Sequence, residues 1–265
     1  ISQLIGAITN IVLDPVFIFG LAFIPSMGVS GAAIATVIGQ IFAMIFVLIV
    51  MYTKKHDVNM SLKKFRPELY YILGICKIGF PVMVMNAVAS FTTMAMNGIL
   101  AKFNNAITIL GIYFKLQSFI FMPIFGLTQG LLPILSYNYG AGNKERYIKT
   151  FKIAVFCAFL IMLLGLLIFQ IFPGLLLSLF NPKTEMVGDG IYALKIISLC
   201  FIPAAFGITF TTALQALTFG KTSLLMSLFR QVIILIPVAV LLSVIYQTKG
   251  VWFCYPVAEL VTIAI

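Results

Sequence analysis

The chain has 265 residues, of which 62% are hydrophobic and only 9% charged, and its mean hydropathy is +1.14. Soluble domains carry about 25% charged residues, so this composition excludes a soluble globular protein. The apolar runs are long and unbroken, which predicts an all-α, polytopic transmembrane helix bundle rather than short alternating barrel strands.

The formal net charge is +10, and most of the Lys and Arg residues lie in two segments, 54–66 and 143–152. Cytoplasmic loops of membrane proteins carry such an excess of positive charge. We therefore expect loops 54–68 and 139–149 to be cytoplasmic. Aromatic residues at the spacing on which single-stranded nucleic acid stacks are absent beside the basic loops, so we expect membrane lipids and not nucleic acid as partners.

The sequence offers few residues suited to metal binding, cofactor binding or catalysis. The only histidine is His56, in a charged loop, and the four cysteines lie singly in apolar segments with no CxxC pair. We expect no metal site and no cofactor. The apolar segments carry neither HExxH nor GxSxG, so an enzyme embedded in the membrane is a low alternative, as is a channel.

Eight apolar spans follow one another along the chain. Their predicted limits are 1–24, 31–53, 69–101, 107–138, 150–180, 190–218, 223–246 and 251–265. Each is long enough, or nearly so, to cross the roughly 30 Å hydrocarbon core of a bilayer as a helix. The chain begins with Ile within or just before the first span, so we expect it to be a fragment of a longer protein.

The first span carries an acid in the middle of an apolar run. Asn10 precedes Asp14 by one helical turn and lies on the same face. Pro15 cannot donate to the carbonyl of Ile11, which leaves that oxygen free near the acid. Because an acid at this depth is costly and is a functional site by default, Asp14 and Asn10 are predicted to bind a coupling proton or small cation.

Thr36 and Gln40 lie one turn apart on the second span and could face the same cavity. We therefore add Thr36 to the predicted ion-coupling site and Gln40 to the candidate substrate cavity. The alternative is structural: Asp14 as a neutral acid bonded to a neighbouring helix, and the other polar side chains as hydrogen-bonding links between helices.

Further polar side chains give candidates in the later spans. On the third span a single polar face predicts a cavity lining, with inter-helix hydrogen bonding equally favoured; its residues are Asn86, Ser90, Thr93 and Asn97. In the fourth span Lys115, with Gln117 nearby, either reaches the interface or pairs with an acid. Glu259 in the last span is the candidate partner of Lys115.

A weak internal repeat indicates two lobes. A shift of 222 residues places Asp14-Pro15-Val16 on Ile236-Pro237-Val238 and Gly28-Val29 on Gly250-Val251. If the repeat is real, residues 1–53 are the last two helices of an N-terminal lobe, 54–68 a linker, and 69–265 a six-helix C-terminal lobe. Asn10 and Asp14 fall on Val232 and Ile236, so ion coupling is expected in the first lobe only.

Three stretches resemble the multidrug and toxic compound extrusion (MATE) family of transporters. TNIVLDPVFIFG…GVSGAAIATVIGQ (9–40) is similar to its fifth and sixth helices, and KIGFPVMV (77–84) to the start of its seventh. PIFGLTQGLLPILSYNYGAGNKER (123–146) resembles its eighth helix and the following loop. The pattern is closest to the DinF-like and MepA-like branch, in which an Asn/Asp pair on the fifth helix maps onto Asn10 and Asp14.

The resemblance implies a secondary antiporter of the cell membrane with two six-helix bundles. It would export cationic, amphipathic drugs or metabolites in exchange for H⁺ or Na⁺ by alternating access. Its expected partners are these small molecules and membrane lipids, and it is expected to be a monomer. The nearest alternative is a flippase of the same superfamily that moves lipid-linked oligosaccharides. Such a flippase needs a strongly cationic cavity, and intramembrane positive charge here is limited to Lys115 and a few other residues.

Overall fold

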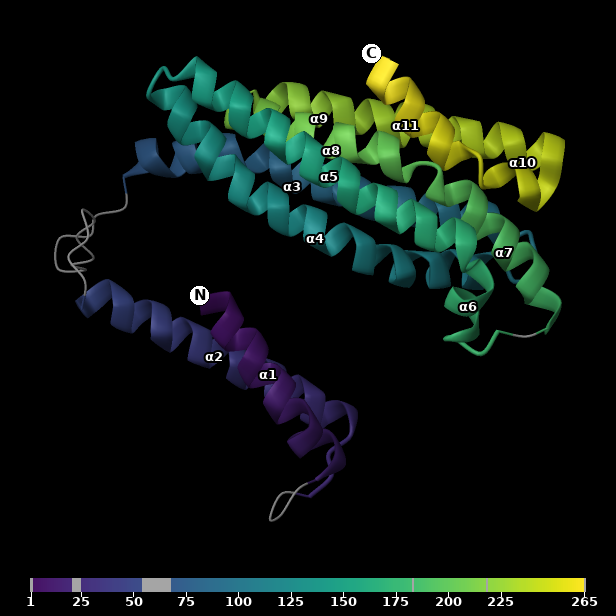
Figure 1. Cartoon of the computed structure of the whole chain (residues 1–265), viewed down its shortest axis with the longest axis horizontal. Helices are drawn as coiled ribbons and strands as arrows, with labels where there is room; N and C mark the ends of the chain where they lie inside the picture. The colour runs from purple at the N-terminus through teal and green to yellow at the C-terminus, as the bar shows by residue number, and fades with distance from the viewer. Residues whose placement is uncertain (1, 21–24, 54–67, 183, 218, 265) are drawn as a thin grey trace. The chain divides into compact units, whose positions relative to one another are not determined.

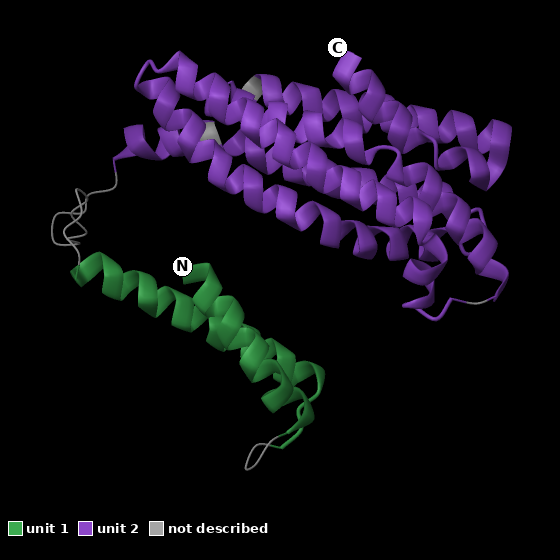
Figure 2. Ribbon diagram, in the orientation of Figure 1, with its two compact units in different colours: residues 1–67 green, residues 68–265 purple. Residues whose placement is uncertain are grey.

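The computed structural model describes residues 2–20, 25–53, 68–182, 184–217 and 219–264. These residues form helices joined by short connections, with no strand among them, which confirms the predicted all-α fold (Figure 1). The chain divides into two compact units, residues 1–67 and 68–265 (Figure 2). The predicted linker 54–68 lies outside the described residues except for Glu68.

Unit 1 is a pair of packed helices, α1 (Ser2–Phe19) and α2 (Val29–Thr53). Glycines let the two backbones approach closely, as in many membrane helix pairs. A Cβ atom added to Gly39 would lie 2.7 Å from the carbonyl oxygen of Gly6. At the other end, the backbone N–H of Met27 donates to the carbonyl of Phe17 at 3.0 Å and closes the connection.

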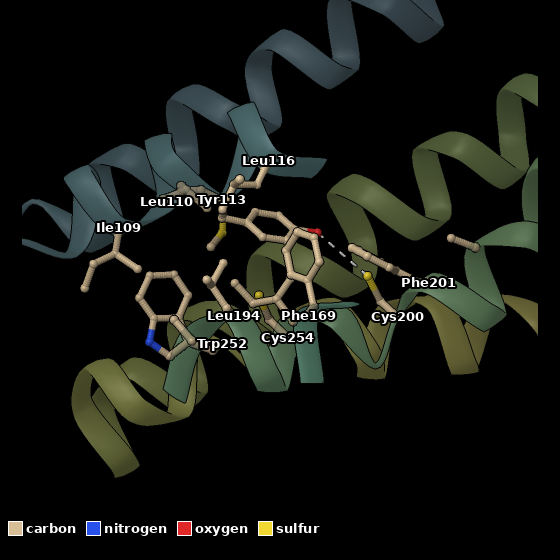
Figure 3. Close-up of a cluster of buried hydrophobic side chains, with 14 of the residues drawn as sticks. Ile109, Leu110, Tyr113, Leu116, Phe169, Leu194, Cys200, Phe201, Trp252 and Cys254 are labelled. Carbon is tan, nitrogen blue, oxygen red and sulfur yellow. Dashed lines mark hydrogen bonds between the residues drawn. The ribbon is translucent and has the colours of Figure 1, made fainter. Parts of the chain in front are cut away.

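Unit 2 holds the remaining elements. In chain order they are α3 (Leu69–Leu100), α4 (Ala106–Gly140), α5 (Lys144–Ile171), α6 (Pro173–Ser178), α7 (Thr184–Ser198), α8 (Phe201–Ala216), α9 (Gly220–Leu228), the π-helical segment η2 (Phe229–Leu235), α10 (Ile236–Val251) and α11 (Cys254–Ala264). Its core is apolar and aromatic, built around Tyr113, Phe169, Phe201 and Trp252, each nearly inaccessible to solvent (Figure 3).

Six described helical segments are long and apolar enough to cross a membrane, and a seventh results if α7 and α8 count as one broken span. The protein is therefore a multi-pass membrane protein. Each predicted apolar span contains a helix, with two differences from the predicted limits. Segment 190–218 is bent by 43° between α7 and α8, and segment 150–180 ends its long helix at Ile171 because Pro173 begins a new one.

The connection between α4 and α5 shows why a helix begins at Lys144. Gly142 has φ 68°, a left-handed conformation that glycine adopts without a steric penalty. The side chain of Asn143 then accepts a hydrogen bond from the backbone N–H of Arg146 at 3.0 Å and caps α5. Predicted loop 139–149 is thus mostly helical, with only a short turn after Gly140.

Candidate functional site

The Asn10 amide connects the two helices of unit 1. Its Nδ2 donates to Oδ1 of Asp14 at 3.2 Å and to Oγ1 of Thr36 at 3.3 Å. The Thr36 hydroxyl donates to the carbonyl of Ala32 at 2.9 Å, so its oxygen is free to accept from Asn10. The structure therefore brings together the three side chains predicted as the ion-coupling site.

The close packing at Gly6 and Gly39 holds this cluster in place. Asn10 lies one turn after Gly6, and Thr36 lies one turn before Gly39, so the glycine contact sets the distance between the two polar side chains. Asp14 and Asn10 are half-buried in unit 1, and Thr36 is exposed. The carboxylate therefore has one amide donor and remains open to a proton or a cation.

A pocket of about 570 Å³ opens beside the cluster, between α1 and α2. Asn10, Thr36 and Gln40 are among its lining residues, together with Gln3 and Met44. Asp14 does not line it and contacts it only through Asn10. The predicted cavity residue Gln40 thus faces the same space as two of the three ion-site candidates.

The polar face predicted on the third span is exposed on unit 2. Asn86, Ser90, Thr93 and Asn97 are all exposed, whereas Val88, Thr92 and Met96 on the other side of α3 are buried. Ser90 and Thr93 donate to carbonyls of their own helix, those of Asn86 and Ala89. Within unit 2 the face therefore makes no hydrogen bond to another described helix, which leaves the predicted cavity role untested.

The predicted pair of Lys115 and Glu259 is wrong. Glu259 on α11 accepts from Nη1 of Arg230 on η2, at 3.2 Å to one carboxylate oxygen and 3.4 Å to the other. Lys115 is exposed, and its Nζ lies 6.0 Å from the centre of the Phe180 ring. The physical reason is packing: α11 contacts η2 directly, which brings Glu259 to Arg230, whereas Lys115 lies over the Phe180 ring. Gln117, beside it, is half-buried.

Charge counting along the sequence would have found the correct pair. After residue 189, Arg230 is the only arginine and Glu259 the only acid. Two opposite charges that are alone in neighbouring apolar spans are expected to pair, because an unpaired charge is costly there.

A second polar feature lies at the break between α7 and α8. Nothing in the sequence indicates it in the way that charge counting indicates the ion pair. Nε2 of Gln170 on α5 donates to the carbonyl of Lys195 at 2.8 Å and to Oγ of Ser198 at 3.0 Å. These bonds satisfy groups that the break frees from the helix. The sequence gives no reason to connect Gln170 with residues about 25 positions later.

Comparison with known proteins places the chain among membrane transporters. The family model MatE matches residues 81–241. The chain is 29% identical over 260 residues to the multidrug export protein MepA of Staphylococcus saprophyticus subsp. saprophyticus, covering 98% of this chain and 56% of that protein. It is 30% identical over 253 residues to MepA of Staphylococcus haemolyticus, covering 95% of this chain and 55% of that protein.

Solved structures agree with the fold. An outward-facing multidrug resistance MATE family transporter of the MOP superfamily matches with a TM-score of 0.86 and 24% identity, over 99% of this chain and 59% of that one. A MATE transporter in complex with MaL6 matches with a TM-score of 0.85 and 25% identity over the same shares. The chain spans a little over half the length of the relatives it matches.

Proposed function

The chain belongs to the MatE family, and from this premise we propose that it works as a secondary active antiporter. It exports cationic or amphipathic drugs or metabolites in exchange for H⁺ or Na⁺ by alternating access. The MepA relatives support the export of drugs. The exchange for an ion is argued from the residues of unit 1.

The observation that carries the proposal is the double hydrogen bond of Asn10. An ionised Asp14 accepts from the Asn10 amide, which at the same time holds Thr36 of the other helix. A proton on Asp14 removes the charge that strengthens the first bond. A sodium ion instead binds the carboxylate and neighbouring oxygens, for which the Thr36 hydroxyl and the Asn10 carbonyl are suited.

Binding of either ion at Asp14 changes the hydrogen bonds through which Asn10 links α1 to α2. Pro15 follows Asp14 inside α1, and a proline within a helix is a usual place for bending. A change in the bonds of Asp14 therefore acts where α1 bends most easily. The pocket beside Asn10 and Thr36 changes shape with that bend, which links ion binding to the release of substrate.

The proposal is tested in a bacterium whose own drug pumps have been deleted, using the intact gene. Efflux of a cationic dye is followed under an imposed proton or sodium gradient, for wild type and Asp14→Asn. The matched control is Asp189→Asn, which removes an exposed acid of unit 2. We expect wild type and the control to extrude dye and Asp14→Asn to fail at equal membrane abundance. Equal activity of all three proteins would refute an ion-coupling role for Asp14.

If no protein extrudes dye under either gradient, the flippase alternative becomes the better explanation. That alternative needs a strongly cationic cavity to hold a pyrophosphate. In the described part of unit 2, the charge of Arg230 is balanced by that of Glu259. The observation therefore favours the drug antiporter.

A further inference from the structure

A second pocket of about 370 Å³ lies wholly within unit 2, lined by residues of α8, α9, η2 and α11. Its volume is within the range of small-molecule sites. The walls are mainly apolar and aromatic, formed by Phe206, Phe210, Leu214, Met226 and Ile263. Such walls accept the apolar body of an amphipathic molecule.

The only charged residue among the described residues that line this pocket is Arg230. One of its nitrogens, Nη1, makes both contacts with Glu259, which does not itself line the pocket. Nε and Nη2 donate to no residue that the structure describes. A guanidinium carries five N–H donors in a planar fork, so most of the binding capacity of Arg230 is unused.

Three hydroxyl side chains line the pocket together with Arg230: Thr211, Ser227 and Thr262. Thr211 and Thr262 donate to carbonyls of their own helices, those of Gly207 and Ala258, both at 2.7 Å. Ser227 is buried, lines the pocket and has no hydrogen-bond partner among the described side chains and backbone groups. Its hydroxyl can donate to a ligand without breaking an existing bond.

The residues that line the pocket favour an anionic ligand over a cationic one. An anionic group finds the free N–H groups of Arg230 and the hydroxyl of Ser227. A cation finds no free carboxylate among the described lining residues, and to reach Glu259 it would have to displace Arg230. Gly207 presents no side chain on the side facing the ion pair, which leaves that route to Arg230 open.

We propose that this pocket binds an amphipathic organic anion, with its anionic head group on the free edge of Arg230 and its apolar body against Phe206 and Phe210. The head group has the same chemistry in a soluble carboxylate and in an anionic lipid. The site goes beyond the proposed antiport, whose coupling residues and pocket are in unit 1. Binding here requires neither a gradient nor Asp14.

The test uses two dansyl probes of similar size and opposite charge, N-dansylglycine and dansyl ethylenediamine. The full-length protein carries Phe210→Trp, so that energy transfer from the introduced indole reports occupancy of this pocket, and it is reconstituted in nanodiscs of phosphatidylcholine. We expect saturable transfer to N-dansylglycine and at least tenfold weaker binding of the ammonium probe. A charge-assisted hydrogen bond accounts for a difference of about this size.

The control variant must remove the charge without leaving Glu259 alone. Arg230→Gln with Glu259→Gln replaces the ion pair by two neutral amides, and an unchanged melting temperature shows that it folds. We expect it to bind N-dansylglycine about tenfold less tightly. Equal binding of the two probes, or wild-type binding by the double variant, would overturn the proposal.

Nanodiscs containing phosphatidylglycerol distinguish the two sources of the ligand. Weaker binding of N-dansylglycine in these discs supports an anion site that a lipid head group occupies. Unchanged binding supports an anion site for a soluble amphiphile. The same discs with the double variant should show no effect of lipid charge, and a lipid effect that persists there would overturn the assignment to Arg230.

Discussion

At the scale of single residues, a few polar side chains connect apolar helices to one another. Asn10 does so in unit 1, because its amide joins Asp14 to Thr36. Asn10 and Asp14 could be predicted from the sequence because they lie one turn apart in an apolar helix. Their connection to Thr36 could not, since it depends on how closely α1 and α2 approach.

Thr36 offers a substitution with a matched control. Thr36→Val keeps the shape of the side chain but removes the oxygen that accepts from Asn10, and Thr36→Ser keeps that oxygen. We expect Thr36→Val to lower gradient-driven dye efflux several-fold, at equal membrane abundance, and Thr36→Ser to retain most of it. Efflux by Thr36→Val at the level of Thr36→Ser would show that the bond has no part in coupling.

We expect the ion pair of Arg230 and Glu259 to affect stability mainly when one partner is removed and the other charge is left unpaired. Glu259→Gln leaves a guanidinium without its carboxylate, which costs about 1–3 kcal/mol for a partly buried group. Replacing both residues by leucine removes the pair without leaving a charge. Thermal melting in detergent should show a lower midpoint for Glu259→Gln than for the double leucine variant, and the reverse order would contradict this explanation.

At the scale of helices, close packing and breaks were the features that sequence reasoning missed. Apolar runs located most helix limits, because hydropathy acts locally, but the end of α5 before Pro173 was not predicted. The bend between α7 and α8 was not predicted either, since the apolar run 190–218 continues across it. The Gln170 side chain, distant in sequence, satisfies the polar groups at this bend.

Gln170→Leu should therefore destabilise unit 2 by about 0.5–1.5 kcal/mol, because the carbonyl of Lys195 loses one of its two donors and Oγ of Ser198 loses its amide donor. Ser198→Ala leaves that carbonyl the Gln170 donor and removes a smaller side chain, so it should cost no more. Thermal melting of the two variants beside wild type measures the difference. Equal melting temperatures for Gln170→Leu and wild type would mean that water or another group replaces the amide.

The glycine contact of α1 and α2 gives a corresponding prediction for unit 1. In Gly39→Ala the new methyl group would meet the carbonyl of Gly6 at 2.7 Å, so the helices must move apart, at a cost of about 1–3 kcal/mol. Gly130→Ala on α4 is the control, because a Cβ there meets nothing within 4 Å. We expect lower membrane abundance and lower efflux for Gly39→Ala only; equal values for both variants would contradict a tight contact.

At the scale of the whole molecule, family membership and the all-α multi-pass fold were predicted correctly, because composition and three short motifs carry that information. The division into two lobes stays a prediction, as does the orientation in the membrane. The chain divides into two compact units at residue 68, close to the predicted boundary. Loop 54–67 lies outside the described residues.

Orientation can be measured with single cysteines in a variant whose native cysteines, among them Cys76, Cys157, Cys200 and Cys254, are replaced by alanine. The positive charge near the start of α5 predicts that Lys149→Cys is cytoplasmic, and Leu179→Cys, beyond the other end of α5, is outside. A membrane-impermeant maleimide should label only Leu179→Cys in intact cells and both after lysis. Labelling of Lys149→Cys in intact cells would reverse the predicted topology.

The most direct measurement separates ion coupling at Asp14 from a structural role. Proteoliposomes containing wild type, Asp14→Asn or Asp189→Asn are loaded with unlabelled substrate, and the entry of labelled dye is followed with and without an ion gradient. We predict that Asp14→Asn exchanges dye like wild type when ion concentrations are equal, but does not accumulate dye when a proton or sodium gradient is imposed. Gradient-driven accumulation by Asp14→Asn at the wild-type level would contradict ion coupling at Asp14.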